Sequence, residues 1–337
     1  MSLPVVATPL RCELALAGKA TPGGTALADP QLLLAVAYGR GANVAADSRM
    51  PQLVVPNRLL AGEPVVEIWR SEAPVRVLGR GTLHWAEDGR VLAGYLRRAI
   101  GAELAAETRA HFRELLDSID ERGYPHLLRV WNYLPGINDG EGNSEHYRLF
   151  NVGRARAFEE RFGATGAERR YPASSAVGTP GEELRTAFLA SRLPALHLEN
   201  PRQIPASRYP CRYGPRAPSF SRATLAAPEL GNALFLSGTA SIVGHETRHA
   251  GSLADQLEET LRNIATTIGE ARNATARQIP PLAEFDLVKI YLRRAEHLEP
   301  VRRALAAVLR PETPTVFLEA DICRSDLALE IEGVALG

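Results

Sequence analysis

The chain has 337 residues, of which 45% are hydrophobic and 23% charged, and its 39 basic and 39 acidic side chains cancel. This composition excludes a disordered or fibrous protein, and the zero net charge provides no field that would steer the chain to nucleic acid or to an anionic membrane surface. The length predicts about two domains, and the charge balance favours a small-molecule partner.

The cysteine content and the N-terminal residues predict where the protein works. Cys12, Cys211 and Cys323 are widely spaced and odd in number, which favours free thiols in a reducing compartment. The first twenty residues or so lack a basic region before their apolar stretch, which charged residues interrupt, so no signal peptide is predicted. No window of about 18 uninterrupted apolar residues occurs, so we expect no membrane span and a cytoplasmic location.

The first predicted elements lie between residues 65 and 134. Residues 65–97 contain short β-branched and aromatic runs separated by turn signals, which predict antiparallel strands. Residues 101–123 place apolar side chains mostly three, four or seven positions apart and end on Gly123, a pattern that predicts an amphipathic helix. Residues 126–134 predict a further strand. The order is therefore strands, helix, strand.

The same order returns in the second half of the chain. Residues 233–243 predict a strand pair bent at Gly238, and residues 253–268 predict a second amphipathic helix. A strand at 287–292, a helix near 298–309 and two closing strands at 315–322 and 327–336 follow. This repetition predicts an α+β protein made of two copies of one unit, with mixed sheets packed against helices.

Residues 163–218, between the two copies, are rich in proline, arginine and serine. They form either a flexible linker or an ordered connection that packs between the two lobes. A predicted helical stretch at 182–191 and an apolar run at 194–200 favour the ordered connection. We therefore expect an N-terminal domain at 1–162, a connection at 163–218 and a C-terminal domain at 219–337.

Arginine and tyrosine gather in two segments, at residues 138–156 and 209–222. The residues in question are Tyr147, Arg148, Arg154, Arg156, Tyr209, Arg212, Tyr213, Arg216 and Arg222. An arginine can bind a carboxylate through two parallel hydrogen bonds, and tyrosine adds a directed hydroxyl beside an apolar wall. The clusters favour a compact dianionic ligand, although each arginine can equally be solvated or paired with a nearby glutamate.

Two glutamates on the last predicted strand are candidates for proton transfer. Glu330 and Glu332 are two residues apart, so in an extended strand both side chains lie on one face. A carboxyl that faces an apolar pocket holds its proton near neutral pH and can donate it, whereas on a solvated face it cannot. Spacing alone does not choose between these alternatives or between the two residues. Cys323, just upstream, is either a small buried apolar residue or a reactive thiol.

No metal or cofactor site is predicted. The sequence has no phosphate-binding glycine loop and no paired cysteines at metal-ligand spacing. His245, Glu246 and His249 match the HExxH string of zinc proteases, but they lie in a predicted turn between Gly244 and Gly251. Zinc binding by this motif requires a helix that places both imidazoles on one face.

Three motifs carry a resemblance to a known family. The runs RYGPRAPSFSRA (212–223), SGTAS (237–241) and EIEG (330–333) resemble the chorismatase family, and the resemblance extends from about residue 65 onward. It implies two fused domains of the reactive-intermediate-deaminase fold, the N-terminal one degenerate and the C-terminal one catalytic. Small deaminases of this fold carry a carboxylate-binding arginine where this chain has Thr315, so imine hydrolysis is not expected.

The resemblance implies that the protein binds chorismate and removes its enolpyruvyl side chain as pyruvate. Glu330 corresponds to the proposed proton donor of the family, and Arg154, Arg216 and Arg293 are expected to bind the two carboxylates. Tyr147 and Tyr213 would orient the ring. The predicted catalytic residues are Glu330 and Cys323, and the predicted substrate contacts are Tyr147, Arg154, Tyr213, Arg216, Ala240 and Arg293.

The two product branches of the family leave the product open. Cys323 resembles the branch that forms 3-hydroxybenzoate, in some members with 4-hydroxybenzoate, whereas Ala240 resembles the branch that hydrolyses chorismate to a dihydroxycyclohexadiene acid. We favour 3-hydroxybenzoate because a thiol at the pocket wall can touch the ring. A deaminase-like or amide-hydrolysing enzyme and a non-catalytic small-molecule sensor are the alternatives. A monomer is expected because a fused pair satisfies contacts that small relatives make in a trimer.

Overall fold

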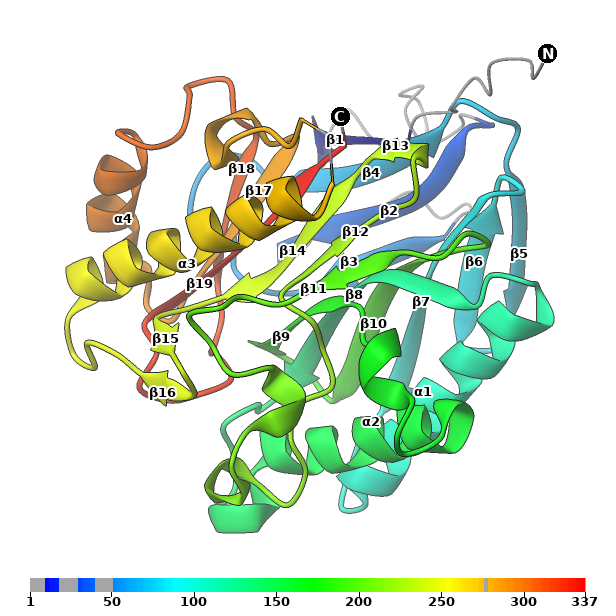
Figure 1. The fold of residues 1–337 in the computed structure, drawn as a ribbon, viewed down its shortest axis with the longest axis horizontal. Coiled ribbons are helices and arrows are strands. Elements are labelled where there is room, and N and C mark those ends of the chain that lie inside the picture. Colours follow the sequence, from blue (N-terminus) through cyan, green and yellow to red (C-terminus); the bar gives the residue numbers. More distant parts are fainter. Residues whose placement is uncertain (1–9, 18–29, 40–50, 276–277, 337) are drawn as a thin grey trace.

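The computed structural model describes residues 10–17, 30–39, 51–275 and 278–336. Three β-sheets face a shared interior, and the long helices lie on the outer faces of two of them (Figure 1). Each sheet contributes one face to a common apolar core. Since the sheets meet at their inner faces, residues distant in sequence come together between them.

The first unit contains six strands and two helices. They are β5 (Arg76–Arg80), β6 (Leu83–Glu87), β7 (Val91–Ala99), α1 (Leu104–Glu121), β8 (His126–Pro135), α2 (His146–Phe162), β9 (Ala173–Thr179) and β10 (Glu183–Ser191). Their sheet, called the first sheet, has the order β5-β6-β7-β10-β8-β9, in which β8 and β9 run parallel and the other neighbours antiparallel.

The second unit repeats this arrangement. It contains β11 (Leu196–Leu198), β12 (Ala223–Leu225), β14 (Leu234–Thr239), α3 (Leu253–Ala274), β17 (Leu287–Leu292), α4 (Leu298–Leu305), β18 (Thr315–Glu319) and β19 (Leu329–Ala335). The second sheet has the order β11-β12-β14-β19-β17-β18, again with one parallel pair, β17 and β18. The connectivity therefore matches that of the first unit step by step, which confirms the α+β class and the predicted duplication. Short strands β13 (Glu229–Asn232), β15 (Ile242–Val243) and β16 (Glu246–Thr247) are added in the loops.

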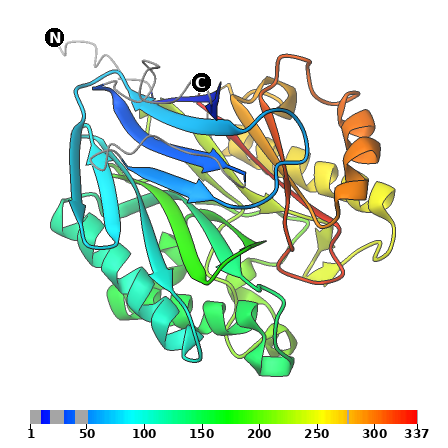
Figure 2. The same cartoon turned by 180° about the vertical axis from the view of Figure 1, so that it is seen from behind.

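A third sheet is built from the N-terminal part of the chain. It has the order β1-β4-β2-β3 and consists of β1 (Leu10–Leu16), β2 (Leu32–Tyr38), β3 (Gln52–Val55) and β4 (Val65–Ser71). Strand β2 contacts β6 and β7 of the first sheet, and β1 contacts β17 of the second. Seen from behind, the blue strands of this sheet lie across the interior between the other two (Figure 2).

Most predicted elements are confirmed, and one is wrong. The helices at 101–123 and 253–268 and the strands at 126–134 and 287–292 are present as α1, α3, β8 and β17. Residues 182–191, predicted as helical, form β10 instead. This strand lies between β7 and β8 and is buried on both faces, so it lacks the alternation that marks a strand with one solvated face.

The segment 163–218 is accordingly more than a connection. Strands β9 and β10 lie within it and complete the first sheet, so a boundary at residue 162 would divide that sheet. The helix α2 is an element that the sequence pattern did not reveal. Its buried side includes the polar and charged residues Asn151 and Arg154 as well as Gly153, which interrupt the apolar stripe of an ordinary amphipathic helix.

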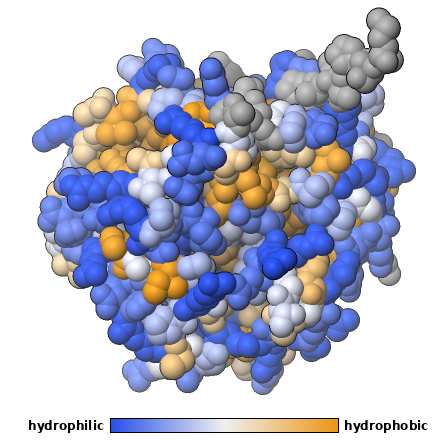
Figure 3. Space-filling view, viewed as in Figure 1, coloured by the Kyte–Doolittle hydropathy of each residue, from blue (hydrophilic) through white to orange (hydrophobic). Residues whose placement is uncertain are grey.

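Most large apolar side chains of the described residues are buried, and the surface is mainly polar (Figure 3). The face in Figure 3 is largely hydrophilic, with apolar residues in separate patches. Large exposed apolar residues, such as Leu196 and Val308, are separated along the described chain. None of the helices in the described ranges is both long enough and apolar enough to cross a membrane.

Four buried charges lie where the three sheets meet. Lys289 of β17 places its Nζ 2.9 Å from Oε2 of Glu67 on β4 and 2.8 Å from Oε1 of Glu332 on β19. Arg129 of β8 lies 2.5 Å from Oε2 of Glu332 and supplies the second positive charge. Each of the four side chains is at most 2% exposed. Positive and negative charges balance, so each buried charge has a partner of opposite sign.

Replacing Lys289 with Met should lower the free energy of unfolding by about 3–5 kcal/mol, because Glu67 loses its ammonium partner and Glu332 keeps only Arg129. Urea denaturation monitored by fluorescence measures the change. The matched control is Arg302→Met, which breaks a surface pair with Glu299 and should cost less than about 1 kcal/mol. Equal midpoints for Lys289→Met and the unaltered protein would contradict the structural role of the network.

Candidate active site

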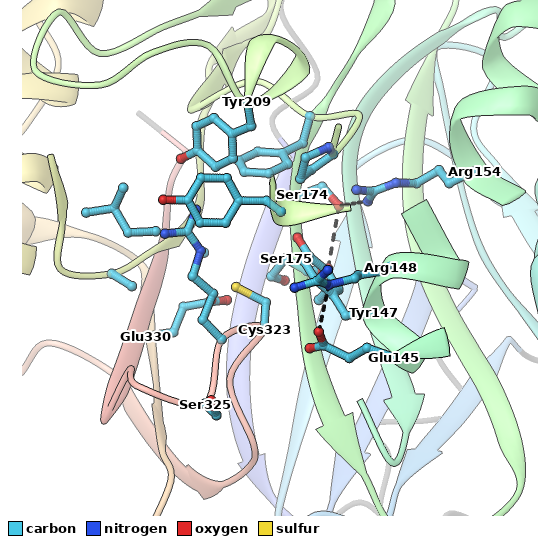
Figure 4. A pocket seen from close by; sticks show the side chains of 18 of the residues that line it. Glu145, Tyr147, Arg148, Arg154, Ser174, Ser175, Tyr209, Cys323, Ser325 and Glu330 are labelled. Atoms are coloured by element: carbon cyan, nitrogen blue, oxygen red, sulfur yellow. Dashed lines mark hydrogen bonds and ion pairs between the residues drawn. The ribbon is translucent and has the colours of Figure 1, made fainter. Parts of the chain in front are cut away.

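A cavity of about 240 Å³ opens between the two units. Its walls come from β9 and α2 of the first unit, from β14 and β19 of the second, and from the loops around residues 209–222 and 323–326. In the close view of Figure 4, Glu330 and Cys323 lie on one side of the cavity, and Arg148 and Arg154 lie on the other. Polar side chains from both halves of the duplication therefore face one small space.

The carboxyl of Glu330 is the buried acid of this cavity. Its residue is 4% exposed, and Oε1 meets no hydrogen-bond donor among the residues that the structure describes. Burial, with a smaller contribution from the charge of Glu332, raises the pKa of Glu330 to about 8. The group is therefore protonated at neutral pH and can act as a proton donor.

A glycine makes room for this carboxyl. The pairing of β14 with β19 shifts register between Leu236 and Thr239, and Gly238 lies in this irregular stretch. A Cβ atom on Gly238 would lie 1.9 Å from Oε1 of Glu330 and 3.1 Å from Cβ of Ser175. The carboxyl thus occupies the space that a side chain at residue 238 would fill.

Glu332, on the same strand, has a different environment. Its Oε1 accepts a hydrogen bond from Nε1 of Trp131 at 2.9 Å and contacts Lys289, and its Oε2 accepts one from Arg129. Burial opposes ionisation, but the charges of Lys289 and Arg129 keep the pKa of Glu332 below its usual value. Glu332 is therefore a charged member of the core, and the structure separates the two glutamates that spacing could not distinguish.

Arg154 is a buried cation on the cavity wall. Its guanidinium donates to Oδ1 of Asn151 at 3.1 Å and to Oγ of Ser174 at 3.5 Å, and it lies 4.8 Å from the centre of the Phe150 ring. Within the described ranges no acidic side chain forms an ion pair with it. A buried guanidinium without a counter-ion favours an anionic ligand.

A second unpaired cation comes from the other half of the chain. The guanidinium of Arg324 stacks 4.1 Å from the ring centre of Tyr213 and donates to the carbonyl oxygen of His245 at 2.9 Å. It too lines the cavity, and no carboxylate in the part of the chain described here pairs with it. Sequence reasoning missed Arg324, and its position next to Cys323 was the one signal that could have suggested it.

Arg148 adds a third guanidinium to the cavity wall. Its Nε donates to Oε2 of Glu145 at 3.0 Å, and both side chains line the cavity. The pair lies on the side of the cavity where Arg154 also points (Figure 4). The positive charge of Arg148 is therefore partly balanced, whereas those of Arg154 and Arg324 are not.

Two of the predicted carboxylate-binding arginines lie elsewhere. Arg216 is 42% exposed, forms an ion pair with Glu159 of α2 and is not among the residues that line the cavity. Arg293 directs its guanidinium to the carbonyl oxygens of Ile322, Arg324 and Leu327, at 2.8–3.0 Å. It thus fixes the loop that carries Cys323. The prediction that Arg216 and Arg293 contact the substrate is not supported by their positions.

The remaining predicted residues do line the cavity. They are Tyr147, Tyr213, Ala240 and Cys323. The Tyr213 hydroxyl lies 3.2 Å from Nδ1 of His245. Burial, followed by the nearby Glu330, raises the pKa of the Cys323 thiol to about 12. The thiol is thus protonated near neutral pH, which favours a role in shaping the cavity over one as a nucleophile.

The HExxH string is not helical. Glu246 begins strand β16, which pairs with β15 in a small hairpin, as the predicted turn implies. His245 faces Arg212 and Tyr213, whereas Nε2 of His249 lies 3.5 Å from Glu259 on α3. The two imidazoles thus have separate partners instead of sharing one helix face.

Comparison with known proteins agrees with this geometry. Residues 67–190 match the family model described as chorismatase FkbO/Hyg5-like, N-terminal, a range that reaches into β10. A chorismatase from Streptomyces rapamycinicus is 40% identical over 291 residues, covering 84% of this chain and 86% of the relative. A 3-hydroxybenzoate synthase from Streptomyces hygroscopicus is 36% identical over 299 residues, covering 86% and 87%.

The fold agrees as well. A crystal structure of a chorismatase matches with a TM-score of 0.87 and 33% sequence identity, and the match covers 97% of this chain and 98% of that one. Similarity in both sequence and structure therefore extends over most of the chain and includes the strands and helices that form the cavity. This protein belongs to the chorismatase family.

Proposed function

We propose that this protein removes the enolpyruvyl group of chorismate and releases pyruvate and 3-hydroxybenzoate. The observation that carries the proposal is Glu330, a protonated carboxyl in a cavity whose walls hold two guanidinium groups without acidic partners. The names of the relatives, chorismatase and 3-hydroxybenzoate synthase, support the same substrate and product.

The charge of the cavity suits the substrate. Chorismate is a cyclohexadiene that carries one carboxylate on the ring and a second on an enolpyruvyl ether. Arg154 comes from the first unit and Arg324 from the second, so two separate cations are available for two carboxylates. Arginine binds a carboxylate through two parallel hydrogen bonds and thereby fixes its orientation. Tyr147 and Tyr213 also line the cavity and offer aromatic surface to the ring.

Proton transfer begins the reaction. The O–H of Glu330 donates its proton to the terminal methylene carbon of the enol ether, which becomes a methyl group. The ether carbon then carries the positive charge of an oxocarbenium ion, and Glu330 is left as a carboxylate. General acid catalysis of this type contributes about 10²–10⁴-fold to the rate. The buried position of Glu330 supplies the acid form at neutral pH.

The ring hydroxyl completes the reaction without added water. Its oxygen bonds to the oxocarbenium carbon and loses its proton, and the bond between this oxygen and the ring then breaks. Loss of a ring proton makes the ring aromatic. The bond between the original ether oxygen and the former enol carbon then breaks, so the attacking oxygen becomes the carbonyl oxygen of pyruvate and the ether oxygen stays on the ring as the hydroxyl of 3-hydroxybenzoate. Of the two protons lost from the ring hydroxyl and the ring carbon, one protonates this phenolic oxygen and the other restores the acid form of Glu330. The atoms of chorismate are thus divided between the two products.

Attack by water is the second candidate route, and it would give a dihydroxycyclohexadiene acid with pyruvate. The observation that favours it is Ala240, which is 5% exposed and whose methyl group takes up space at the cavity wall. Cys323 supports the aromatic product because its protonated thiol lies at the wall beside Glu330. Chromatography of the products from chorismate distinguishes 3-hydroxybenzoate, 4-hydroxybenzoate and the dihydroxy acid, and the dihydroxy acid alone would exclude the proposed route.

Replacing Glu330 with Gln keeps the size of the side chain but removes the acidic proton. We expect kcat for pyruvate release to fall by about 10²–10⁴-fold, measured with a lactate dehydrogenase coupled assay. Glu319→Gln is the matched control because Glu319 lies on β18 of the same sheet and pairs with Arg58 outside this cavity. An unchanged rate of pyruvate release in Glu330→Gln would exclude Glu330 as the acid.

The pH dependence follows from the raised pKa of Glu330. Only the protonated carboxyl donates, so kcat/KM should fall as pH rises through about 8 and lose tenfold for each further unit. Rates measured between about pH 6 and 10 give this alkaline limb. A profile that stays level through this range would contradict a proton donor with the pKa of Glu330.

The arginine assignments can be tested as a matched pair. Arg154→Met retains an apolar stem beside Phe150 but removes the guanidinium, and KM for chorismate should rise about tenfold to a hundredfold. Arg216→Met removes a guanidinium that lies outside the cavity, so KM should stay within about twofold. An unchanged KM in Arg154→Met together with a raised KM in Arg216→Met would assign carboxylate binding to Arg216 instead.

A further inference from the structure

The side chains of Glu330 and Glu332 project from the same face of β19 but end in different surroundings. The intervening Ile331 and the preceding Leu329 pack in the core beneath α3, so the two carboxyls lie on the opposite face. On that face Tyr291 of β17 is paired in register with Glu330, and Lys289 is paired with Glu332. One carboxyl reaches the cavity, and the other reaches the charged network.

The network fixes the carboxylate of Glu332. Lys289 and Trp131 approach its Oε1 at 2.8 and 2.9 Å, and Arg129 approaches its Oε2 at 2.5 Å. These donors come from two sheets and are themselves buried. With two cations and an indole N–H directed at it, Glu332 is held as a charged group in one orientation.

The same network reaches the wall of the cavity. The guanidinium of Arg129 that binds Glu332 also donates to Oγ of Ser175 at 3.1 Å. Ser175 lines the cavity. Its Cβ and the carboxyl of Glu330 both border the space that a side chain at Gly238 would occupy. Arg129 therefore connects the charged residue to the surface against which the acid rests.

We propose that Glu332 is a positioning residue for the reaction, whose fixed negative charge keeps the proton on Glu330 and leaves that carboxyl directed into the cavity. The inference rests on the proposed role of Glu330 as the acid. Alternate residues of a strand are separated by about 6–7 Å, a distance over which charges in a buried site interact strongly.

Other groups that face Glu330 do not supply this charge. Cys323 approaches from the loop after β18, Tyr147 from α2 and Tyr291 from β17. Burial raises the pKa of each of these three groups, so each is neutral near pH 7.

Arg129, from β8, is the charged neighbour that acts in the opposite direction. Its positive charge favours the ionised form of Glu330, but the same guanidinium is already bound to Glu332. After burial itself, the charge of Glu332 makes the larger contribution to the raised pKa of Glu330, and Arg129 lowers that pKa by less. Among the described groups around Glu330, Glu332 is therefore the negative charge that holds the proton in place.

The test is the pH profile of Glu332→Gln. Removing the negative charge should move the alkaline limb of kcat/KM from about pH 8 to lower pH by about one unit or more. A purely structural role would lower the melting temperature without moving this limb. An unmoved limb in a folded variant would overturn the inference.

A second variant keeps the test valid if Glu332→Gln alone does not fold. In Glu332→Gln, the two positive charges of Arg129 and Lys289 keep only one negative partner in the network, Glu67. The double variant Arg129→Met/Glu332→Gln removes one charge of each sign and keeps the balanced pair of Lys289 and Glu67. Because the double variant also removes the opposing charge of Arg129, its limb should move in the same direction by a smaller amount. An alkaline limb that stays at the unaltered pH in both variants would also overturn the inference.

Stability provides a readout that does not depend on catalysis. The folded pKa of Glu330 is raised from 4.5 to about 8, so the unaltered protein should lose melting temperature relative to Glu330→Gln as pH rises between these values. When Glu332 is also replaced by Gln, the melting temperature should stop falling relative to the Glu330→Gln form at a lower pH. If it stops falling at the same pH with and without Glu332, the inference is refuted. If Glu330→Gln keeps full activity, the proposed role of Glu330 as the acid fails, while the melting curves still test the influence of Glu332.

Discussion

The junction of four buried charges at the meeting of three sheets is the constraint on which the rest of the structure depends. Glu67 comes from the third sheet, Arg129 from the first, and Lys289 and Glu332 from the second. Taking such groups out of water is costly, and the cost is offset only while each charge keeps its partner. The arrangement therefore specifies how the sheets face one another. It also explains how an N-terminal sheet that does not line the cavity influences the strand that carries the acid.

The duplication produces one candidate site because the two copies have diverged at corresponding strands. By connectivity, β10 of the first unit occupies the place that β19 occupies in the second. Strand β19 carries Glu330 and Glu332 on its inner face, whereas the fully buried polar residues of β10 are Thr186 and Ser191. The first unit instead contributes α2 and β9, and with them Arg154 and the serines of the cavity wall. One copy thus supplies the proposed proton donor, and both supply cations.

The sequence predicted those features that local spacing determines. Helix α1 follows from apolar periodicity, and strand β17 follows from a short run that contains the β-branched and aromatic residues Val288, Ile290 and Tyr291. Strand β10 was misassigned because burial on both faces removes alternation and its apolar residues are mainly leucine and alanine. The resemblance, and not the spacing, singled out Glu330. The arginines could not be separated in advance, because the group that neutralises Arg216 is Glu159, 57 residues away in sequence. Whether an arginine is free to bind a ligand depends on such distant partners, which only the fold reveals.

The way in which Arg293 holds the loop after β18 has a consequence for how this site can change during evolution. Its guanidinium binds the main-chain oxygens of Ile322, Arg324 and Leu327, and a main-chain oxygen is present whatever side chain the residue carries. The path of the loop is therefore largely independent of the residue at position 323. Substitutions at position 323 can therefore change the shape and chemistry of the cavity wall while the main-chain contacts that set the path of the loop stay the same.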